Sequence, residues 1–152
     1  MNLLTPKRIS KYTNCHFEFI KEIYFNNNSK NDLPEGRNTF IKFIGINTTN
    51  KRIKDKSNFY EVKNKHDELV GIFELEDSHL TLLYVKNDLH KRGVGSFCLG
   101  IIKDLLKTKY DQLTLFSTPS AIIFYHKQGF LKVSKEMFNT KGIRYYHMRL
   151  LL

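Results

Sequence analysis

The sequence lacks the features of membrane-spanning and exported chains. No apolar run approaches the roughly 20 residues that a bilayer crossing requires. The first 14 residues have neither a continuous apolar core nor the small-residue cleavage site of a signal peptide. Apolar and charged fractions of 41% and 26% are ordinary for soluble globular domains and exclude disordered, collagen-like and coiled-coil classes. We therefore expect a cytoplasmic protein without a membrane partner.

Cysteine and clustered histidine are also scarce. Cys15 and Cys98 lie far apart, which indicates reduced thiols rather than a disulfide. The six histidines show no His-x-x-x-His spacing and the cysteines no Cys-x-x-Cys spacing, so we expect no metal site. Cys15 next to His16 could suggest a nucleophile and its base, but adjacent residues in a helix do not face each other. Cys98 falls on the apolar stripe of a predicted helix and is expected in the core.

Acidic residues are the remaining scarce class. The chain has 15 of them against 25 Lys and Arg, a formal net charge of +10. Residues 1–78 hold 13 basic and 11 acidic residues, whereas residues 79–152 hold 12 and 4. A basic half indicates nucleic acid, an anionic membrane surface or a phosphate-rich ligand. A codon bias towards Lys and Asn explains the same excess, so charge alone does not identify a partner.

Hydrophobic periodicity predicts helices first and strands afterwards. Helical spacing covers residues 17–24 and 37–46, with Pro34-Glu35-Gly36 expected to break the chain between them and polar residues 47–58 expected as a loop or frayed helix end. From residue 59 onward, the expected elements are strands at 59–62, 69–75 and 79–85, a helix at 95–107, a strand at 113–117, a helix at 120–128, and strands at 130–133 and 143–152. Short turns make the first three strands an antiparallel meander. The order predicts a mixed-sheet α/β domain with helices on both faces.

The sharpest local signal lies between an apolar strand and an amphipathic helix. It is the segment His90-Lys91-Arg92-Gly93-Val94-Gly95-Ser96. Glycines let the backbone turn tightly and leave its N–H groups uncovered. A helix N-terminus adds unpaired N–H donors and a positive dipole end. The segment therefore predicts a phosphate or pyrophosphate site, although its spacing matches neither the P-loop nor the dinucleotide fingerprint.

A second motif, Phe124-Tyr125-His126-Lys127-Gln128-Gly129-Phe130, follows one strand later. The ordered pair resembles the GNAT N-acetyltransferase superfamily, whose Arg/Gln-x-x-Gly-x-Gly/Ala loop corresponds to residues 90–95, with His90 as a departure, and whose Phe-Tyr-x-x-x-Gly-Phe segment corresponds to residues 124–130. The resemblance implies a GNAT-like acyl-CoA N-acyltransferase fold in a single domain over 1–152. Acceptor-side elements would occupy about 1–58 and the acetyl-CoA-binding core about 69–133.

The resemblance implies an enzyme that transfers the acetyl group of acetyl-CoA to a primary amine by direct attack in a ternary complex. The cofactor pyrophosphate would lie on the amides of residues 91–96, and the pantetheine arm along residues 83–85, where a backbone N–H would stabilise the oxyanion. Thr118 stands where many relatives carry Asn and would contact the arm. The implied cofactor-binding residues are Leu83, Tyr84, Val85, His90, Lys91, Arg92, Gly93, Val94, Gly95, Ser96, Thr118 and Tyr125.

Tyr125 stands at the position of the family's general acid, which protonates the departing thiolate. The base is open among His79, Glu76 and, less strongly, Glu74, because each is also typical of a solvated strand or turn residue. Strict alternation would place His79 on one face with Thr81, Leu83 and Val85. No base is needed if the amine arrives neutral.

Other interpretations stay open at the level of sequence. Basic and aromatic residues alternate over 144–149, which fits either a strand or a surface that stacks on nucleic acid. A basic nucleic-acid- or ribosome-binding module and an inactive CoA-sensing domain are therefore the alternatives, with nucleic acid the less favoured partner. Homodimerisation is common in relatives. The acidic residues that could attract a cationic amine, or simply be solvated, are Glu18, Glu22, Asp32 and Glu35.

Overall fold

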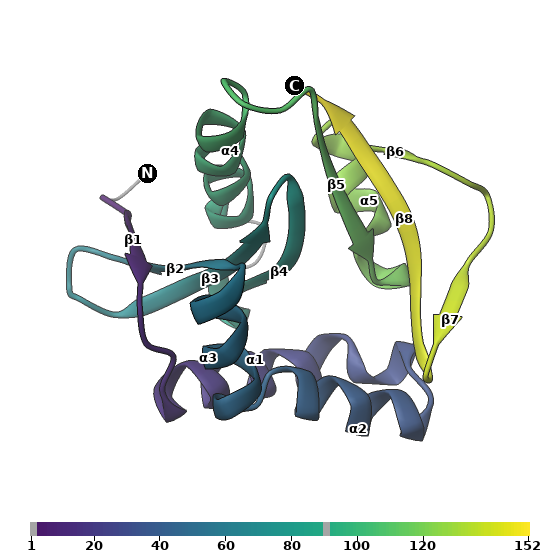
Figure 1. The fold of residues 1–152 in the computed structure, drawn as a ribbon, viewed down its shortest axis with the longest axis horizontal. Helices are drawn as coiled ribbons and strands as arrows, with labels where there is room; N and C mark the ends of the chain where they lie inside the picture. The colour runs from purple at the N-terminus through teal and green to yellow at the C-terminus, as the bar shows by residue number, and fades with distance from the viewer. Residues whose placement is uncertain (1–2, 90–91) are drawn as a thin grey trace.

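The computed structural model describes residues 3–89 and 92–152 and has one sheet at its centre (Figure 1). The strand order is β1-β2-β3-β4-β5-β8-β6, and β7 pairs with β8. β4 and β5 are parallel, and the other pairs are antiparallel. The strands are β1 (Thr5–Ile9), β2 (Asn58–Lys63), β3 (Leu69–Glu76), β4 (His79–Val85), β5 (Gln112–Ser117), β6 (Leu131–Lys132), β7 (Phe138–Thr140) and β8 (Ile143–Leu151).

Helices cover both faces of this sheet, so the mixed α/β prediction is confirmed. They are α1 (Asn14–Asn27), α2 (Pro34–Phe43), α3 (Ile46–Asp55), α4 (Val94–Leu106) and α5 (Ile122–Lys127), with 3-10 turns η1 (Ser29–Asn31), η2 (Asn87–Leu89) and η3 (Pro119–Ala121). None of the helices in the described part of the chain has the length and apolarity to cross a bilayer. The predicted β2–β3–β4 meander and the strand at 143–152 are confirmed.

Two local predictions for the N-terminal third are wrong, and one strand was missed. Pro34-Glu35-Gly36 does not break the chain but begins α2, because proline is well tolerated in the first helical turn. Gly36 is needed there for contact: a Cβ would lie 2.1 Å from the Gly142 carbonyl oxygen. Most of residues 47–58 belongs to α3. The edge strand β1 was not expected, since its one buried residue is Ile9 and it gives almost no apolar pattern.

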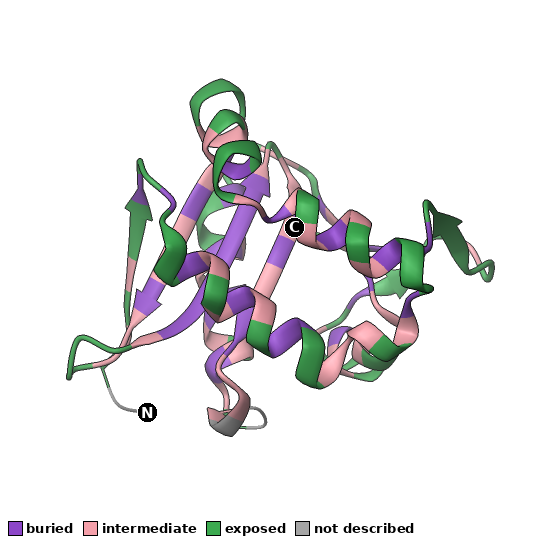
Figure 2. Cartoon of the chain, turned by 90° about the horizontal axis from the view of Figure 1, so that it is seen from below, coloured by how far each residue is buried: buried purple, intermediate pink, exposed green. Residues whose placement is uncertain are grey.

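Each face of the sheet has its own hydrophobic core. Under α4 and α5, fully buried Cys98, Leu99 and Ile102 pack with Phe73 and Leu115, as expected for Cys98. Under α1–α3, a second cluster is rich in aromatic rings. Its buried members are Ile9, Tyr12, Ile20, Ile23, Tyr24, Phe40, Ile44, Phe59, Ile72, Leu82 and Tyr84. Figure 2 shows the buried positions following the central strands and the inner sides of the helices.

β4 has a β-bulge at Thr81, directly after the two residues that pair with β5. Leu75 pairs with Leu80 and Glu74 with Leu82, which leaves Thr81 as an extra residue in β4. The pairing of β4 with β5 comprises His79–Thr114 and Leu80–Leu115, after which the strands diverge (Figure 1).

The bulge also corrects the predicted facing of His79. Leu80 and Val85 belong to the core under α4, with Leu83 packed against it, whereas Leu82 and Tyr84 belong to the other core. Because the extra residue shifts the alternation, His79 lies opposite Leu83 and Val85 rather than on their face.

Candidate active site

The divergence of β4 and β5 opens a cleft with a volume of about 460 Å³. Residues of α1, α2, β4, β5, α5 and β8 line it, so both ends of the chain contribute to one site. Of the residues singled out from the sequence, those that line the cleft are Asp32, Glu76, His79, Thr81, Leu83, Tyr84, Thr118 and Tyr125. The walls are mainly aromatic and aliphatic, with few polar groups, as is usual for sites that bind small molecules.

Tyr125 enters the cleft from α5. Its residue is 9% exposed, and its ring packs edge-on against Phe124 and Phe130 with centroid distances of 5.1 and 5.5 Å. Its hydroxyl makes no hydrogen bond within the part of the chain that the structure describes. Burial raises the pKa of Tyr125 well above its ordinary value. The phenol is therefore protonated at neutral pH and can donate a hydrogen bond to a ligand, while the same shift makes it a weaker acid than an exposed tyrosine.

His79 lines the same cleft, at the start of β4. A ring nitrogen, Nδ1, is 2.8 Å from the Thr114 Oγ1, and the ring meets Phe116 edge-on at 4.6 Å. Burial, followed by the nearby His147, lowers the pKa of His79, and Glu76 opposes the shift. At neutral pH the imidazole is therefore neutral and able to accept a proton.

The two candidate glutamates have different environments. Glu76 lines the cleft and pairs with Lys56 at 3.3 Å, but both side chains are more than a third exposed, so solvent weakens the pair. Glu74 is fully buried and accepts two hydrogen bonds from Arg52, at 2.8 and 3.0 Å. Arg52 also donates to the Phe43 carbonyl oxygen at 2.7 Å. Glu74 is therefore held in a structural ion pair with Arg52, which no local sequence pattern indicates.

The β4 edge presents backbone groups to the cleft. The Lys86 N–H donates to the Val70 carbonyl at 2.9 Å, and hydrogen-bonded pairs alternate along an antiparallel ladder. Tyr84, paired with Ile72, therefore directs its backbone groups towards β3, and Leu83 directs its N–H and C=O away from β3. Leu83 lines the cleft, so its N–H is available there.

The predicted phosphate loop leads into α4, although His90 and Lys91 lie outside the described residues. Gly93 has φ +84°, the left-handed conformation that favours glycine, and precedes Val94 at the helix start. A Cβ on Gly95 would lie 2.9 Å from the Phe124 ring, so this glycine is needed for the approach of α4 to α5. Arg92 and Ser96 are exposed. No described side chain caps α4, which leaves its first N–H groups for another acceptor.

Thr118 is tied to the acceptor-side helices. Asn28 Nδ2 donates to the Thr118 Oγ1 at 3.4 Å and to the Ser120 Oγ at 3.3 Å. Ser120 in turn donates to Asn31 Oδ1 at 2.9 Å. These hydrogen bonds link the C-terminal end of α1 and η1 to η3. They also orient the Thr118 hydroxyl, which lines the cleft.

Asp32 is the residue whose environment the sequence could least predict. Glu18, Glu22 and Glu35 are exposed, in line with the solvated alternative, whereas Asp32 is 6% exposed and lines the cleft. Its carboxylate accepts hydrogen bonds from the Tyr24 hydroxyl and, at 2.9 Å, from the Arg144 N–H. No sequence motif marks this contact, because it joins segments 112 residues apart. Within residues 3–89 and 92–152 no group of His, Cys, Asp and Glu is arranged to hold a metal ion.

Comparison with known proteins gives the same fold. A GCN5-related N-acetyltransferase from Rhodopseudomonas palustris superposes with a TM-score of 0.74 at 17% identity, covering 99% of this chain and 96% of that one. The PaiA N-acetyltransferase from Thermoplasma acidophilum in complex with coenzyme A gives 0.68 at 17% identity, covering 99% of both chains. A spermidine/spermine N-acetyltransferase, SpeG from Vibrio cholerae, gives 0.63 at 16% identity, with 97% and 93% covered. No curated protein is significantly similar in sequence.

The family model for the acetyltransferase (GNAT) domain matches residues 27–152, which is most of the chain and includes α2, both motifs and every residue that lines the cleft except Tyr24. The match confirms the resemblance to the GNAT superfamily that the two motifs indicated, and the fold of the structural neighbours agrees with it. The chain belongs to the GNAT family of acetyl-CoA-dependent N-acetyltransferases.

Proposed function

We propose that the chain acetylates a primary amine that enters the β4–β5 cleft, by direct attack in a ternary complex. The observation that carries this proposal is that Tyr125, whose protonated hydroxyl has no partner among the described residues, and His79, with a neutral imidazole, line the same cleft. Acetyl-CoA supplies the acetyl group as an activated thioester. The residues of this chain would bind and orient the two substrates and transfer the protons.

The residues present fit the cofactor. The uncapped N-terminus of α4, with Gly93 before it, offers backbone donors to a pyrophosphate, and Arg92 adds positive charge. The Leu83 N–H, directed into the cleft, would hydrogen-bond the thioester carbonyl oxygen and stabilise the oxyanion, a contribution of about 3–4 kcal/mol for one donor. Thr118 Oγ1 would contact the pantetheine arm.

Proton transfer is assigned to these two side chains, His79 and Tyr125, which both line the cleft. His79 would take a proton from the incoming ammonium, directly or through one water, because its lowered pKa keeps the ring neutral. Tyr125 would donate its phenolic proton to the departing sulfur. Glu76, exposed and paired with Lys56, is the second candidate for the base.

The decisive experiment replaces Tyr125 by phenylalanine. Loss of a general acid lowers kcat by roughly 100-fold or more, while the Kd for CoA, measured by calorimetry, should stay within about twofold because the ring contacts are kept. Tyr110→Phe, which removes a half-buried hydroxyl outside the cleft, is the matched control. An equal loss of turnover and CoA affinity would assign Tyr125 to binding, and absence of CoA binding by the wild type would refute the proposal.

His79→Gln tests the base through its pH dependence. At neutral pH, where the amine is protonated, we expect kcat to fall by roughly 100-fold. As the pH approaches the amine's own pKa, free amine accumulates and the difference from wild type should shrink. His66→Gln, in the exposed β2–β3 turn, should change nothing. A deficit that is the same at every pH would mean that His79 positions ligands rather than accepts a proton.

A further inference from the structure

Asp32 brings a buried negative charge to the cleft. The Tyr24 hydroxyl donates to one carboxylate oxygen and the Arg144 N–H to the other, at 2.9 Å. Burial, and then the Asp32 hydrogen bond and charge, raise the pKa of Tyr24 well above its ordinary value, so the phenol stays protonated and continues to donate. Both donors are neutral, and two neutral donors orient a carboxylate without cancelling its charge.

The charge of Asp32 has no counter-ion within the described residues. Glu74, buried to the same degree, is neutralised by two hydrogen bonds from Arg52. Arg37 is close enough to influence Tyr24 electrostatically, but its Nε donates to the Ser29 carbonyl oxygen at 3.0 Å instead. Burying a charge without an ionic partner costs stability, and an uncharged acceptor would satisfy the same two donors. A carboxylate here therefore indicates a cation that comes from outside the chain.

The walls next to Asp32 suit such a cation. Tyr24 and Phe40 stack at 4.1 Å, and Phe40 meets Tyr84 at 5.9 Å, so the carboxylate lies beside a set of aromatic rings that also line the cleft. Aromatic faces attract ammonium groups through the ring quadrupole, most strongly where water is excluded. One carboxylate among aromatic rings recognises positive charge.

The same cleft connects Asp32 with the proposed reaction centre. Asp32, Tyr84 and Tyr125 all line it. Tyr84 is connected to the Asp32 end of the cleft by ring contacts, because it meets Phe40, which stacks on Tyr24, the residue that donates to Asp32. An extended ligand in a space of about 460 Å³ can therefore place one end at Asp32 and the other near Tyr125.

We propose that Asp32, held by Tyr24 and the Arg144 amide, binds a cationic group of the acceptor other than the amine that is acetylated. The acceptor is accordingly an amine that carries a second positive charge. This assignment rests on the proposed function, because it takes the cleft to be the place where the amine reacts. It names a substrate class and a specificity residue for that site.

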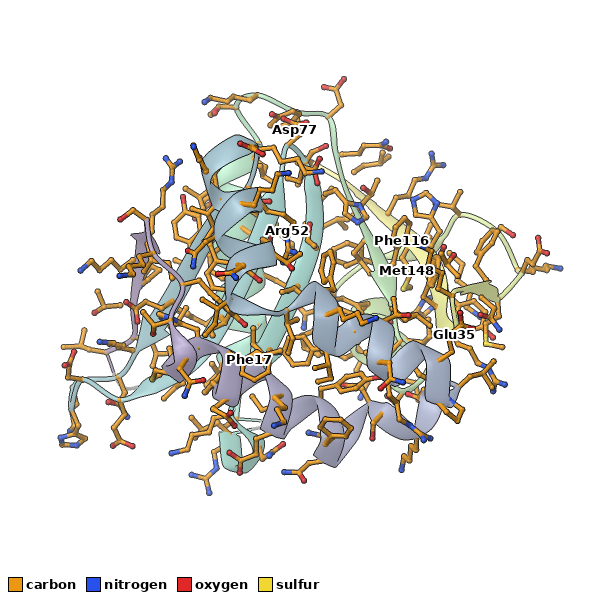
Figure 3. The ribbon with its side chains drawn as sticks, turned by 60° about the horizontal axis from the view of Figure 1, so that its bottom comes forward. Phe17, Glu35, Arg52, Asp77, Phe116 and Met148 are labelled. Atoms are coloured by element: carbon orange, nitrogen blue, oxygen red, sulfur yellow. The ribbon has the colours of Figure 1, made fainter. Side chains whose placement is uncertain are left out.

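The test compares two acceptors of equal chain length, cadaverine and n-pentylamine, which differ in the second ammonium group. Wild-type kcat/KM should favour cadaverine by about tenfold or more, the value of one hydrogen-bonded charge pair. Asp32→Asn should abolish the preference while leaving CoA affinity unchanged. Glu35→Gln removes an exposed carboxylate at the start of α2 (Figure 3) and should keep the preference. If the Asn variant is misfolded, Asp32→Ser takes its place.

The outcomes separate this proposal from the proposed function. Equal kcat/KM for both amines in the wild type, or a preference that survives in Asp32→Asn, would overturn the cation site even though acetyl transfer occurs. If neither amine is acetylated, calorimetry of cadaverine with the CoA-loaded protein still reads the site. Binding that weakens about tenfold in Asp32→Asn supports the cation site and refutes turnover of these amines, whereas absence of cadaverine binding at millimolar ligand refutes the site.

Discussion

The two faces of the sheet bury different kinds of side chain. Under α4 and α5 the buried side chains of the described residues carry no charge, Ser117, Cys98 and Tyr125 being the polar or weakly polar ones, and the predicted cofactor contacts come mainly from the backbone. Under α1–α3 the protein buries Glu74, Asp32, His16 and Thr49 among aromatic rings. The face that would hold a fixed cofactor thus depends on shape, while the face that would select an acceptor depends on charge. Substitutions on the two faces should therefore fail for different reasons.

The largest effect is expected where charge is buried on the acceptor face. Arg52→Met leaves Glu74 fully buried without a partner, and the free energy of unfolding should fall by about 3–5 kcal/mol. Figure 3 shows Arg52 on α3, which this pair fastens to the sheet. Chemical denaturation at neutral pH measures the loss. Lys56→Met, which breaks the exposed pair with Glu76, is the control and should cost less than about 1 kcal/mol.

A double variant decides whether the unpaired charge is the cause. Arg52→Met combined with Glu74→Leu removes both charges and should recover much of the lost stability, because apolar replacements of buried pairs are often tolerated. If the double variant were as unstable as the sum of the single ones, the loss would come from packing of the Arg52 side chain on Phe43 instead. The two faces would then differ less than their composition indicates.

On the cofactor face, the contact most sensitive to substitution is the close approach of α4 to α5. Gly95→Ala places a methyl group 2.9 Å from the Phe124 ring, so the ring or the two helices must shift, and we expect a loss of about 1–3 kcal/mol in unfolding free energy together with weaker CoA binding. Gly100→Ala is a matched control on the same helix, because a Cβ there meets nothing within 4 Å. It should instead stabilise the protein by about 0.5–1 kcal/mol. Similar losses for both variants would contradict the steric account.

The same contrast explains what could be predicted from the sequence. Residues 69–133 carry strong periodicity and two motifs, and there β3, β4, α4 and β5 agree with the expected elements to within a residue or so. Local pattern suffices where each residue faces either one core or water. The predicted facing of His79 failed because the bulge at Thr81 interrupts strict alternation. No local sequence pattern indicates an extra residue in an apolar strand.

The acceptor side was harder because its contacts are long-range. α3 looks polar since Arg52 and Thr49 face inward and pair there, so the usual apolar stripe is missing. Asp32 could be identified only as one of several acids until the fold brought Arg144 and Tyr24 to it. Buried polar networks are assembled by tertiary structure, and a hydrophobic pattern cannot encode them.

The smallest effect expected is a pH dependence confined to the acceptor face. Burial lowers the pKa of His16, against the opposing effect of Glu61, so below about pH 6.5 the unfolded chain binds a proton more readily than the folded one. Stability should therefore decline as the pH falls from 7 towards 5. His16→Gln keeps a capping-box residue at the third position of α1 but cannot titrate, so its unfolding free energy should vary less with pH. Leu99→Val, fully buried on the cofactor face, should lower stability by a similar amount at every pH, and a pH slope unaltered in His16→Gln would place the titrating group elsewhere.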